Sequence, residues 1–316
     1  MKAFESYPWL KKPANELLQM PTLPNRLIIE GKPGLGKNEF AFDLIKQILC
    51  NEHNGCGYCQ SCLYLKDNTH PEFLLVNLEE KKSFISVEQA RKIIHFMNLT
   101  VSTNTSRVVL IENADRLNYQ AQNSLLKTLE EASPKKFLLL VSNQRGALLP
   151  TIYSRCFIQR IGSPSSSVLD SWLQNQGIID VSANDFPSFY SPKQIKKKVE
   201  EGNAQIFNIV LQNLDNFLLG QQAVVATQNA FRDMEISFPE KLDLLIHYIN
   251  LKIGTEAHFY KPHSKYKSLN HTGLSQIKAA AFIDELLDYK KTLLKIPGLN
   301  EQIGFNYFLT KLPRVF

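Results

Sequence analysis

Short apolar runs alternate with segments of helical periodicity through the first half of the chain. The apolar runs predict strands at Arg26–Glu30, Phe73–Asn77, Val108–Ile111, Phe137–Val141 and Phe157–Gln159. The second, third and fourth of these runs are almost continuously apolar, as strands buried on both faces must be. Apolar residues recur at helical spacing within 40–49 and within 87–97. Strands that alternate with helices in this way predict an α/β domain with a parallel sheet.

Two local signals refine the helices of this domain. Ser86 followed by Gln89 is a capping-box pattern, which predicts where the helix over 87–97 begins. A third helix is expected over Gln120–Ala132, because Pro134 disfavours helical backbone just before it.

The strand pattern stops after Gly162–Pro164. From there on the sequence predicts only helices, at Ser167–Gln176, Ile206–Leu219, Lys241–Ile253, Ser275–Lys295 and Glu301–Leu312. The stretch between Gly177 and Gly202 is short and polar enough to form a small separate helical unit. We therefore expect an α/β domain over 1–161, a small helical lid over 162–203 and an all-helical domain over 204–316.

Composition places the chain among ordinary globular proteins. It has 316 residues, of which 44% are hydrophobic and 21% charged, which suits two or three domains. No apolar run is long enough to span a membrane, and the first residues lack the layout of a secretory signal, so a cytoplasmic protein is expected. A net charge of +6 permits an anionic partner without establishing one.

A glycine-rich segment follows the first predicted strand. Its pattern, GKPGLGKN over 31–38, precedes a predicted helix, which is the context that a G-x-x-x-x-G-K-[ST] phosphate loop requires. Gly31, Gly34 and Gly36 let the backbone curl so that its N–H groups point at phosphate oxygens, and the helix N-terminus adds partial positive charge. Lys37 would reach the outer phosphates.

Two positions that ATP hydrolysis needs are altered. Asn38 stands where the motif requires Ser or Thr, and an amide is a poorer ligand for Mg²⁺ than the hydroxyl would be. The strand Val108–Ile111 is followed by Glu112 and Asn113, where an active enzyme of this kind would carry Asp-Glu. Asn113 cannot accept a proton, and Asp115 is a weak substitute two residues later. The pattern therefore indicates a phosphate loop that has lost hydrolysis.

Four cysteines follow the helix of the phosphate loop. Cys50, Cys56, Cys59 and Cys62 give the spacing C-x5-C-x2-C-x2-C, which suits tetrahedral Zn²⁺ in a closed, structural site. Two disulfides, which a cytoplasmic setting disfavours, or free thiols are the alternatives. Cys156 stands apart and is expected to be a small buried apolar residue.

Further segments resemble one family. Residues 123–131 (NSLLKTLEE) resemble the box N-x-L-L-K-x-L-E-E of clamp loaders, and Ser154–Cys156 is similar to their S-R-C motif. A four-cysteine insert after the loop helix is another hallmark of bacterial clamp loaders. The motifs occur in the family's order over roughly residues 26–160, so the chain resembles the AAA+ clamp-loader family. The resemblance implies an AAA+ P-loop domain with a zinc insert, a lid, and a helical collar for oligomerisation.

The resemblance also implies a role within that family. Gamma/tau subunits keep the Ser/Thr and the Asp-Glu pair, whereas the delta-prime branch departs from both, as this chain does at Asn38, Glu112 and Asn113. Such a subunit of the DNA polymerase III holoenzyme would be an inactive stator, with no ATPase or polymerase activity of its own, and whether it binds ATP is doubtful. Its partners would be the gamma/tau and delta subunits, and through the complex the sliding clamp and primer-template DNA.

One arginine carries the implied chemistry. Arg155, in the S-R-C motif, would be offered in trans to the ATP of a neighbouring subunit, since a planar guanidinium can bind two phosphoryl oxygens at once. Asn143 resembles the sensor-1 residue of the family. No arginine around Ser191–Lys193 matches the sensor-2 residue of active members.

Two other functions remain open on the residues alone. The chain could be an active clamp-loader ATPase that uses Glu112 for the metal, which steady-state ATP hydrolysis would reveal. It could also be a zinc-stabilised nucleic-acid-binding module, which predicts salt-dependent DNA binding by the isolated protein.

Overall fold

The computed structural model describes residues 3–80, 82–99, 106–131, 133–187, 189–234, 236–256, 274–295 and 300–315. The chain divides into two compact units. The first comprises Met1–Ile179 with Ser191–Gln194, and the second comprises Asp180–Tyr190 with Ile195–Phe316. The expected division into three domains stays a prediction beside this grouping.

The first unit is built on a five-stranded sheet whose order is β2-β3-β4-β1-β5 and whose pairs are all parallel. Its strands are β1 Arg26–Glu30, β2 Phe73–Val76, β3 Arg107–Ile111, β4 Lys136–Ser142 and β5 Phe157–Arg160. Each lies within one residue of the range expected from the apolar runs. The prediction of a parallel α/β domain is therefore confirmed.

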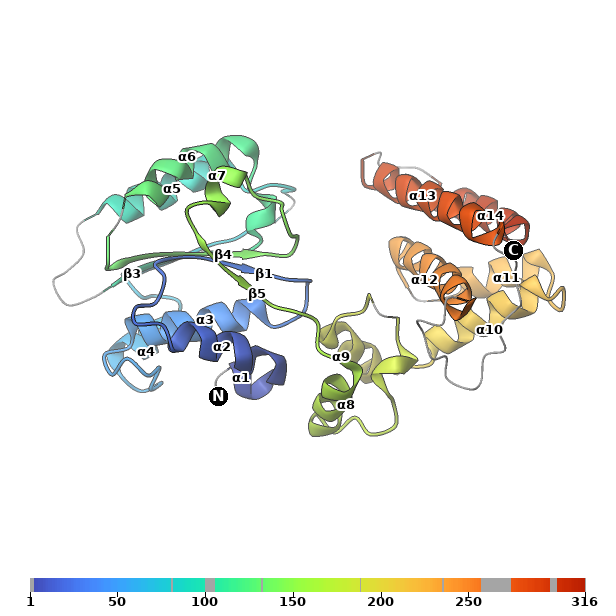
Figure 1. Cartoon of the computed structure of the whole chain (residues 1–316), viewed down its shortest axis with the longest axis horizontal. Coiled ribbons are helices and arrows are strands. Elements are labelled where there is room, and N and C mark those ends of the chain that lie inside the picture. Colours follow the sequence, from blue (N-terminus) through green and yellow to red (C-terminus); the bar gives the residue numbers. More distant parts are fainter. Residues whose placement is uncertain are drawn as a thin grey trace. The chain divides into compact units, whose positions relative to one another are not determined.

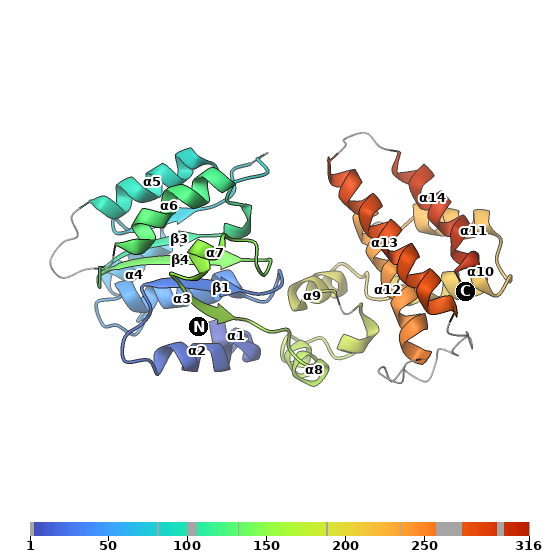
Figure 2. The ribbon, with the colours of Figure 1, turned by 45° about the horizontal axis from the view of Figure 1, so that its top comes forward.

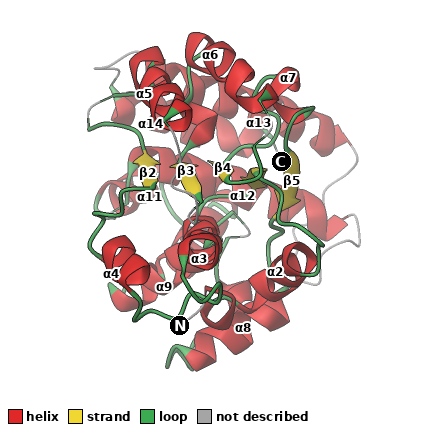
Figure 3. Ribbon diagram, turned by 90° about the vertical axis from the view of Figure 1, so that its left-hand side faces the viewer, coloured by secondary structure: helices red, strands yellow, loops and turns green. Residues whose placement is uncertain are grey.

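Helices cover both faces of this sheet. The helices and 3-10 turns of the unit are α1 Ala3–Ser6, η1 Pro8–Leu10, α2 Lys11–Leu18, α3 Lys37–Leu49, α4 Gln60–Lys66, α5 Val87–Asn98, η2 Ala114–Arg116, α6 Tyr119–Glu130, α7 Pro150–Tyr153 and α8 Ser166–Asn175. Figure 1 shows α5, α6 and α7 above the sheet and α2, α3 and α4 below it. When the unit is viewed from the left-hand side of Figure 1, the strands form one row between the two helix layers (Figure 3).

Alternation along the strands assigns side chains to the two layers. In β1, Leu27 and Ile29 pack in one core cluster with α2 and α3, whereas Ile28 packs in another with α5 and α6. Successive side chains of a strand point to opposite faces, so each central strand has to be apolar throughout. All five residues of β3 are buried, and the four from Val108 to Ile111 are apolar for this reason.

The edge strand corrects one expectation. Phe73–Asn77 was expected to be buried on both faces, but β2 lies at the end of the sheet and Leu75 is 41% exposed. An edge strand has a neighbour on one side only, so less of its surface is covered. Apolar residues in an edge strand look the same in the sequence as those of a central strand.

The capping box is confirmed. Ser86 accepts a hydrogen bond from the backbone N–H of Gln89, and the Gln89 side chain accepts one from the backbone N–H of Ser86. This arrangement satisfies two backbone donors at the first turn of α5. The parallel helix α6 begins at a similar cap, because Asn118 accepts from the N–H of Ala121.

Every described element of the second unit is helical. These elements are η3 Ala183–Asp185, most of α9 Pro192–Glu200, α10 Ile206–Leu218, α11 Val224–Arg232, α12 Phe238–Glu256, α13 Leu274–Lys295, α14 Glu301–Lys311 and η4 Leu312–Arg314. Figure 2 shows α10 to α14 within this unit. They enclose one apolar cluster, to which Phe231 of α11 contributes, although the sequence pattern had not indicated that helix. Among the described residues, no helix combines the length and the apolar character needed to cross a membrane.

Candidate functional site

The glycine-rich segment 31–38 connects β1 to α3, as the sequence predicts. Gly34 and Gly36 have φ angles of +73° and +82°, in the left-handed region that glycine adopts without strain. Gly36 is the N-cap of α3, and Lys37 and Asn38 are its first two residues. The loop therefore has the backbone course of a phosphate loop at a helix N-terminus.

Lys37 is not directed into solvent. Its side chain is only 4% exposed, and Nζ donates to the carbonyl oxygen of Lys32 at 2.6 Å and to Oδ1 of Asn143 at 2.8 Å. Burial lowers the pKa of Lys37 to about 8, although the nearby Asp115 and Glu39 partly oppose that effect. The amine that would bind phosphate is thus held by neutral oxygens of its own chain.

A chain of amides continues from Asn143 along the carboxyl edge of the sheet. Asn143 donates through Nδ2 to Oδ1 of Asn113 at 2.9 Å, and Asn113 donates to Oδ1 of Asn77 at 2.9 Å. Asn77 then donates to Oε2 of Glu112 at 2.9 Å. The backbone N–H of Asn143 donates to Asp115 at 2.8 Å. The structure thus joins the predicted residues Glu112, Asn113 and Asn143 in one network.

Asn77 was not among the predicted site residues, because the apolar pattern marks it only as the end of a strand. Its position was the available signal, since polar residues just beyond parallel strands gather at one edge of the sheet. Burial, with Glu39 adding to it, raises the pKa of Glu112 at the far end of the network.

Residues outside the motif lie close against the loop. A side-chain carbon built on Gly34 would lie 2.1 Å from Oγ of Ser191, and one built on Gly36 would lie 2.8 Å from the ring of Tyr7. Lys193 forms an ion pair with Glu39 of α3, and its Nζ lies 5.6 Å from the centre of the Tyr7 ring. The sequence pattern around 191–193 gives no sign of these contacts.

Both tryptophans of the chain hold the amino-terminal segment in place. Trp9 donates through Nε1 to the carbonyl of Leu35 at 2.9 Å, and Trp172 of α8 donates to the carbonyl of Ser6 at 2.7 Å. Their ring centres lie 5.5 Å apart, edge to face. The loop, the amino terminus and α8 are therefore tied together by directional hydrogen bonds as well as by apolar packing.

Arg155 lies elsewhere, just after α7. Its hydrogen bonds go to Glu130 at the end of α6 and to Thr151 and Ser154 beside it. Its side chain is 33% exposed. The neighbouring Cys156 was expected to be buried but is only partly so, and burial raises its pKa to about 12. None of these hydrogen-bond partners of Arg155 belongs to the network around Lys37.

The four cysteines of the insert converge. The Sγ atoms of Cys50, Cys56, Cys59 and Cys62 lie within 4.8 Å of one another, all four thiols are free, and those of Cys50 and Cys59 are 3.9 Å apart. Zinc–sulfur bonds of about 2.3 Å in a tetrahedron would put the sulfurs about 3.8 Å apart. The arrangement could therefore hold a metal ion of that size, and no disulfide joins these four residues in the structure.

Backbone N–H groups support the thiolate form in part of this cluster. Cys56 donates its N–H to Sγ of Cys50 at 3.4 Å, and Cys59 donates to Sγ of Cys56 at 3.3 Å. Burial alone would raise the pKa of Cys50, but such hydrogen bonds outweigh it and lower the pKa to about 6. A thiolate is the form that binds metal.

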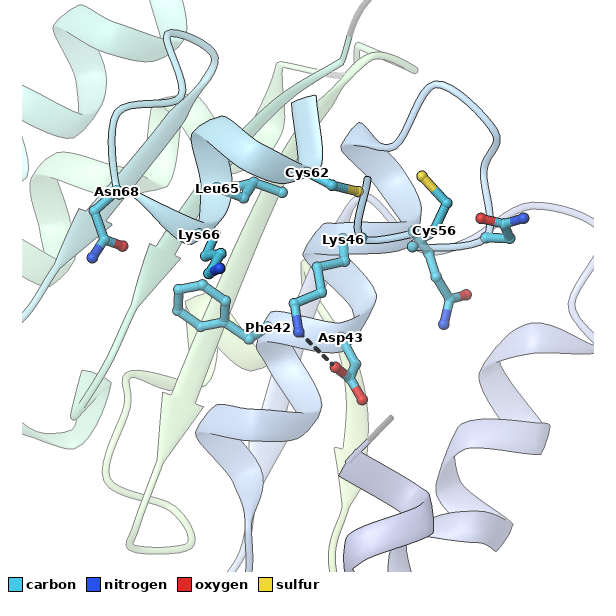
Figure 4. A pocket seen from close by; sticks show the side chains of 12 residues that line it. Phe42, Asp43, Lys46, Cys56, Cys62, Leu65, Lys66 and Asn68 are labelled. Carbon is cyan, nitrogen blue, oxygen red and sulfur yellow. Dashed lines mark hydrogen bonds and ion pairs between the residues drawn. The ribbon is translucent and has the colours of Figure 1, made fainter. Parts of the chain in front are cut away.

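Hydrogen bonds of Ser61 connect the cysteine insert to the end of α3. Ser61 donates through Oγ to the carbonyl of Leu49 at 2.6 Å and lies 2.9 Å from Nε2 of His70. The backbone N–H of Glu72 donates a hydrogen bond to Nδ1 of His70. The ring proton is therefore on Nε2, which donates a hydrogen bond to Oγ of Ser61. A cavity of about 530 Å³, lined in part by Cys56 and Cys62, lies beside the cysteine cluster (Figure 4). Phe42 and Lys46 of α3 line one side of it, with Cys62, Leu65 and Lys66 on the other.

These features define a class first: a P-loop α/β unit with a cysteine cluster after its loop helix. Residues 10–165 match the family model described as "DNA polymerase III, delta subunit".

Individual relatives agree with the family match. A protein of Pseudomonas aeruginosa named DNA polymerase III subunit delta' is 35% identical over 170 residues, covering 53% of this chain and 52% of the relative. Its namesake in Yersinia pestis is 32% identical over 176 residues, covering 54% and 52%. The chain thus matches about half the length of these curated relatives. The structure of a DNA polymerase III gamma subunit-related protein of Thermotoga maritima aligns with 97% of this chain and over 98% of its own length, with a TM-score of 0.44 and 14% sequence identity.

Proposed function

We propose that this chain is a delta-prime-like subunit of the DNA polymerase III clamp loader. In this proposal it does not hydrolyse ATP itself and offers Arg155 to the ATP of a neighbouring subunit. The observation that carries the proposal is the closed network around Lys37, in which Asn143, Asn113 and Asn77 occupy the edge of the sheet where metal and water would act.

The network opposes turnover for two physical reasons. An amide at position 113 cannot take a proton from water, and its oxygen and nitrogen already bond Asn143 and Asn77. The N–H of Lys37 that is bonded to Asn143 can reach another acceptor only after that hydrogen bond is broken. A phosphate could use the third N–H of the ammonium group, but it would have to compete with the two oxygens of the chain that already hold Lys37, which supports weak nucleotide binding without hydrolysis.

Arg155 suits action outside its own chain. Its side chain is partly exposed and follows a short surface helix, so a neighbouring protein can approach it. Charge builds on the equatorial oxygens of the phosphoryl group during transfer, and the guanidinium fork matches that geometry. Lysine lacks the fork, although it keeps the charge.

The remaining assignments follow from the same proposal. Zn²⁺ bound by Cys50, Cys56, Cys59 and Cys62 would have a structural role, because four thiolates leave no open coordination position. Gamma/tau and delta subunits would be the direct partners in the cytoplasm, and the clamp and primed DNA would be reached through the complex. Residues 162–203 would form the lid and 204–316 the collar.

Arg155→Ala in a reconstituted complex tests this function. The chain should still assemble, and the defect should appear in ATP turnover by the neighbouring subunit. Loss of a finger costs about 10³–10⁵ in rate at the site concerned. Total DNA-stimulated ATPase should fall only partly, because other sites keep their fingers, while clamp loading should fall further.

Arg155→Lys is the matched variant, since it retains the charge without the fork. It should resemble Arg155→Ala in both assays. If both variants assemble normally and show unchanged ATPase and clamp loading, Arg155 is an ordinary surface arginine and the proposed role is wrong.

A further inference from the structure

The guanidinium of Arg155 is engaged by a carboxylate of its own chain. Nε and Nη2 both donate to the same oxygen, Oε1 of Glu130, at 3.1 and 2.6 Å. Nη1 donates to the carbonyl of Thr151 at 2.9 Å and to Oγ of Ser154 at 3.3 Å. Of the five N–H donors of an arginine, these contacts use four.

The edge that Glu130 uses is one that a two-pronged phosphate contact needs. A guanidinium grips two phosphoryl oxygens through a pair of parallel N–H groups on one edge. With Nε and Nη2 on Glu130, and Nη1 on Thr151 and Ser154, no edge of Arg155 has both of its donors free. A neighbour's phosphate therefore has to displace one set of partners, and Glu130 is the partner that carries like charge to the phosphate.

The fold does not need this ion pair to join α6 to the segment that bears Arg155. Leu125 and Leu129 of α6 are buried in the same apolar cluster as Ile152 of α7. Gln122 of α6 also accepts a hydrogen bond from the backbone N–H of Leu149 at 2.8 Å. Glu130 can therefore release Arg155 without separating the two elements.

Glu130 is also poorly placed as a permanent partner. It is the last residue of α6, where the negative end of the helix dipole disfavours a carboxylate. The two side chains are 54% and 33% exposed, and a surface pair of this kind changes an equilibrium by up to about fivefold. The polyanionic phosphates of ATP can outcompete one exposed carboxylate.

We propose that Glu130 is a latch that holds Arg155 on its own chain until the nucleotide of a neighbouring subunit displaces it. The inference rests on the proposed function for its consequence, since the latch matters only if Arg155 acts in trans. In this scheme Thr151 and Ser154 keep the guanidinium in place once Glu130 has let go. Glu130 acts through Arg155 and is a positioning residue.

The first experiment examines the latch in the full-length chain alone. In protein labelled with ¹⁵N-arginine, the Nε–H signal of Arg155 is identified by its absence in Arg155→Ala. Glu130→Gln should shift that signal and speed its exchange with water. Glu131→Gln is the matched control, because it removes the adjacent carboxylate, which lies 3.9 Å from Lys127 rather than on Arg155. An Nε–H signal that responds equally to both variants would show that no latch exists.

The second experiment uses the reconstituted complex with ATP as the probe. Glu130→Gln should lower the ATP concentration at half-maximal turnover by about two- to fivefold relative to Glu131→Gln, with kcat unchanged. The difference should shrink as salt is raised. A rise in that concentration, a fall in kcat, or equality with Glu131→Gln overturns the latch.

The two proposals fail separately. If Arg155→Ala leaves turnover unchanged, the finger role is wrong, whatever Glu130→Gln does in the isolated chain. If Arg155→Ala lowers turnover while Glu130→Gln matches Glu131→Gln, the finger stands and the latch is wrong.

Discussion

Helix α3 carries a ligand-binding motif at each end, and the polar groups of the two motifs differ in how far the chain itself satisfies them. At the amino end, Lys37 is bonded to Lys32 and Asn143, and the amide chain continues from there. At the carboxyl end, four free thiols meet within 4.8 Å, a spacing that fits a metal ion. The lysine of the phosphate loop is thus hydrogen-bonded within the chain, whereas the four sulfur atoms of the cysteine cluster surround a space that could hold a metal ion.

The difference separates two meanings of a preserved motif. The loop at 31–38 keeps its glycines and its helix, but Lys37 and the amides at the edge of the sheet are hydrogen-bonded to partners within the chain. The cysteine cluster concentrates negative charge as its thiols ionise, and that charge is stabilised when a cation binds. A motif is best judged by whether its donors and acceptors still need a ligand.

The largest effect is expected at the carboxyl end of α3. Cys59→Ser should release the metal, because structural zinc sites bind with about 10–16 kcal/mol in small peptides and need all their ligands. Elemental analysis should fall from one equivalent of zinc to below half, while the sheet remains folded. Cys156→Ser, outside the cluster, should keep its zinc. Wild-type protein purified with less than half an equivalent of metal would contradict the assignment.

The next effect concerns the buried amine at the other end. Burial lowers the pKa of Lys37 from 10.5 to about 8, so between these values the unfolded chain binds a proton that the folded chain does not. The free energy of unfolding should therefore rise with pH over this window, by about 3 kcal/mol in all. Lys37→Met should remove that rise. Denaturant unfolding of both proteins from about pH 8 to about pH 10 measures it, and parallel curves would show that Lys37 is not buried as described.

A smaller effect tests whether the amide network is coupled to Lys37. Asn143→Ala removes an acceptor from the ammonium group and should cost about 1.5–3 kcal/mol of unfolding free energy, as hydrogen bonds to charged groups do. Asn123→Ala is the control, because its exposed amide bonds only its own helix, at Tyr119. Equal losses in the two variants would mean that the network adds no stability.

The smallest expected effect is none at all. Asn38→Thr restores the hydroxyl of the phosphate-loop motif, yet steady-state ATP hydrolysis by the chain should stay at the background of Lys37→Met, because Asn113 still cannot polarise water. Turnover at about 1–100 s⁻¹, as in kinases, would refute the view that the amino end of α3 is closed.

Local sequence patterns determined much of the architecture. Short apolar runs located the five strands of the sheet, and Ser86 with Gln89 located the start of α5, because strand burial and helix capping depend on residues close in sequence. The same holds for the course of the phosphate loop and for the gathering of four cysteines spaced within thirteen residues. These features need few partners from distant parts of the chain.

Long-range contacts decided the rest. Several features depend on residues that are far apart in sequence. They are the edge position of β2, the approach of Tyr7 and Ser191 to the loop, the place of Asn77 in the amide network and the pairing of Glu130 with Arg155. No periodicity or spacing encodes which surface residues will meet once strands and helices pack. The sequence by itself therefore determined the elements and the motifs, while only the tertiary structure decided which polar groups those motifs had already bound, since hydrogen bonding acts over a few ångströms in space and not along the chain.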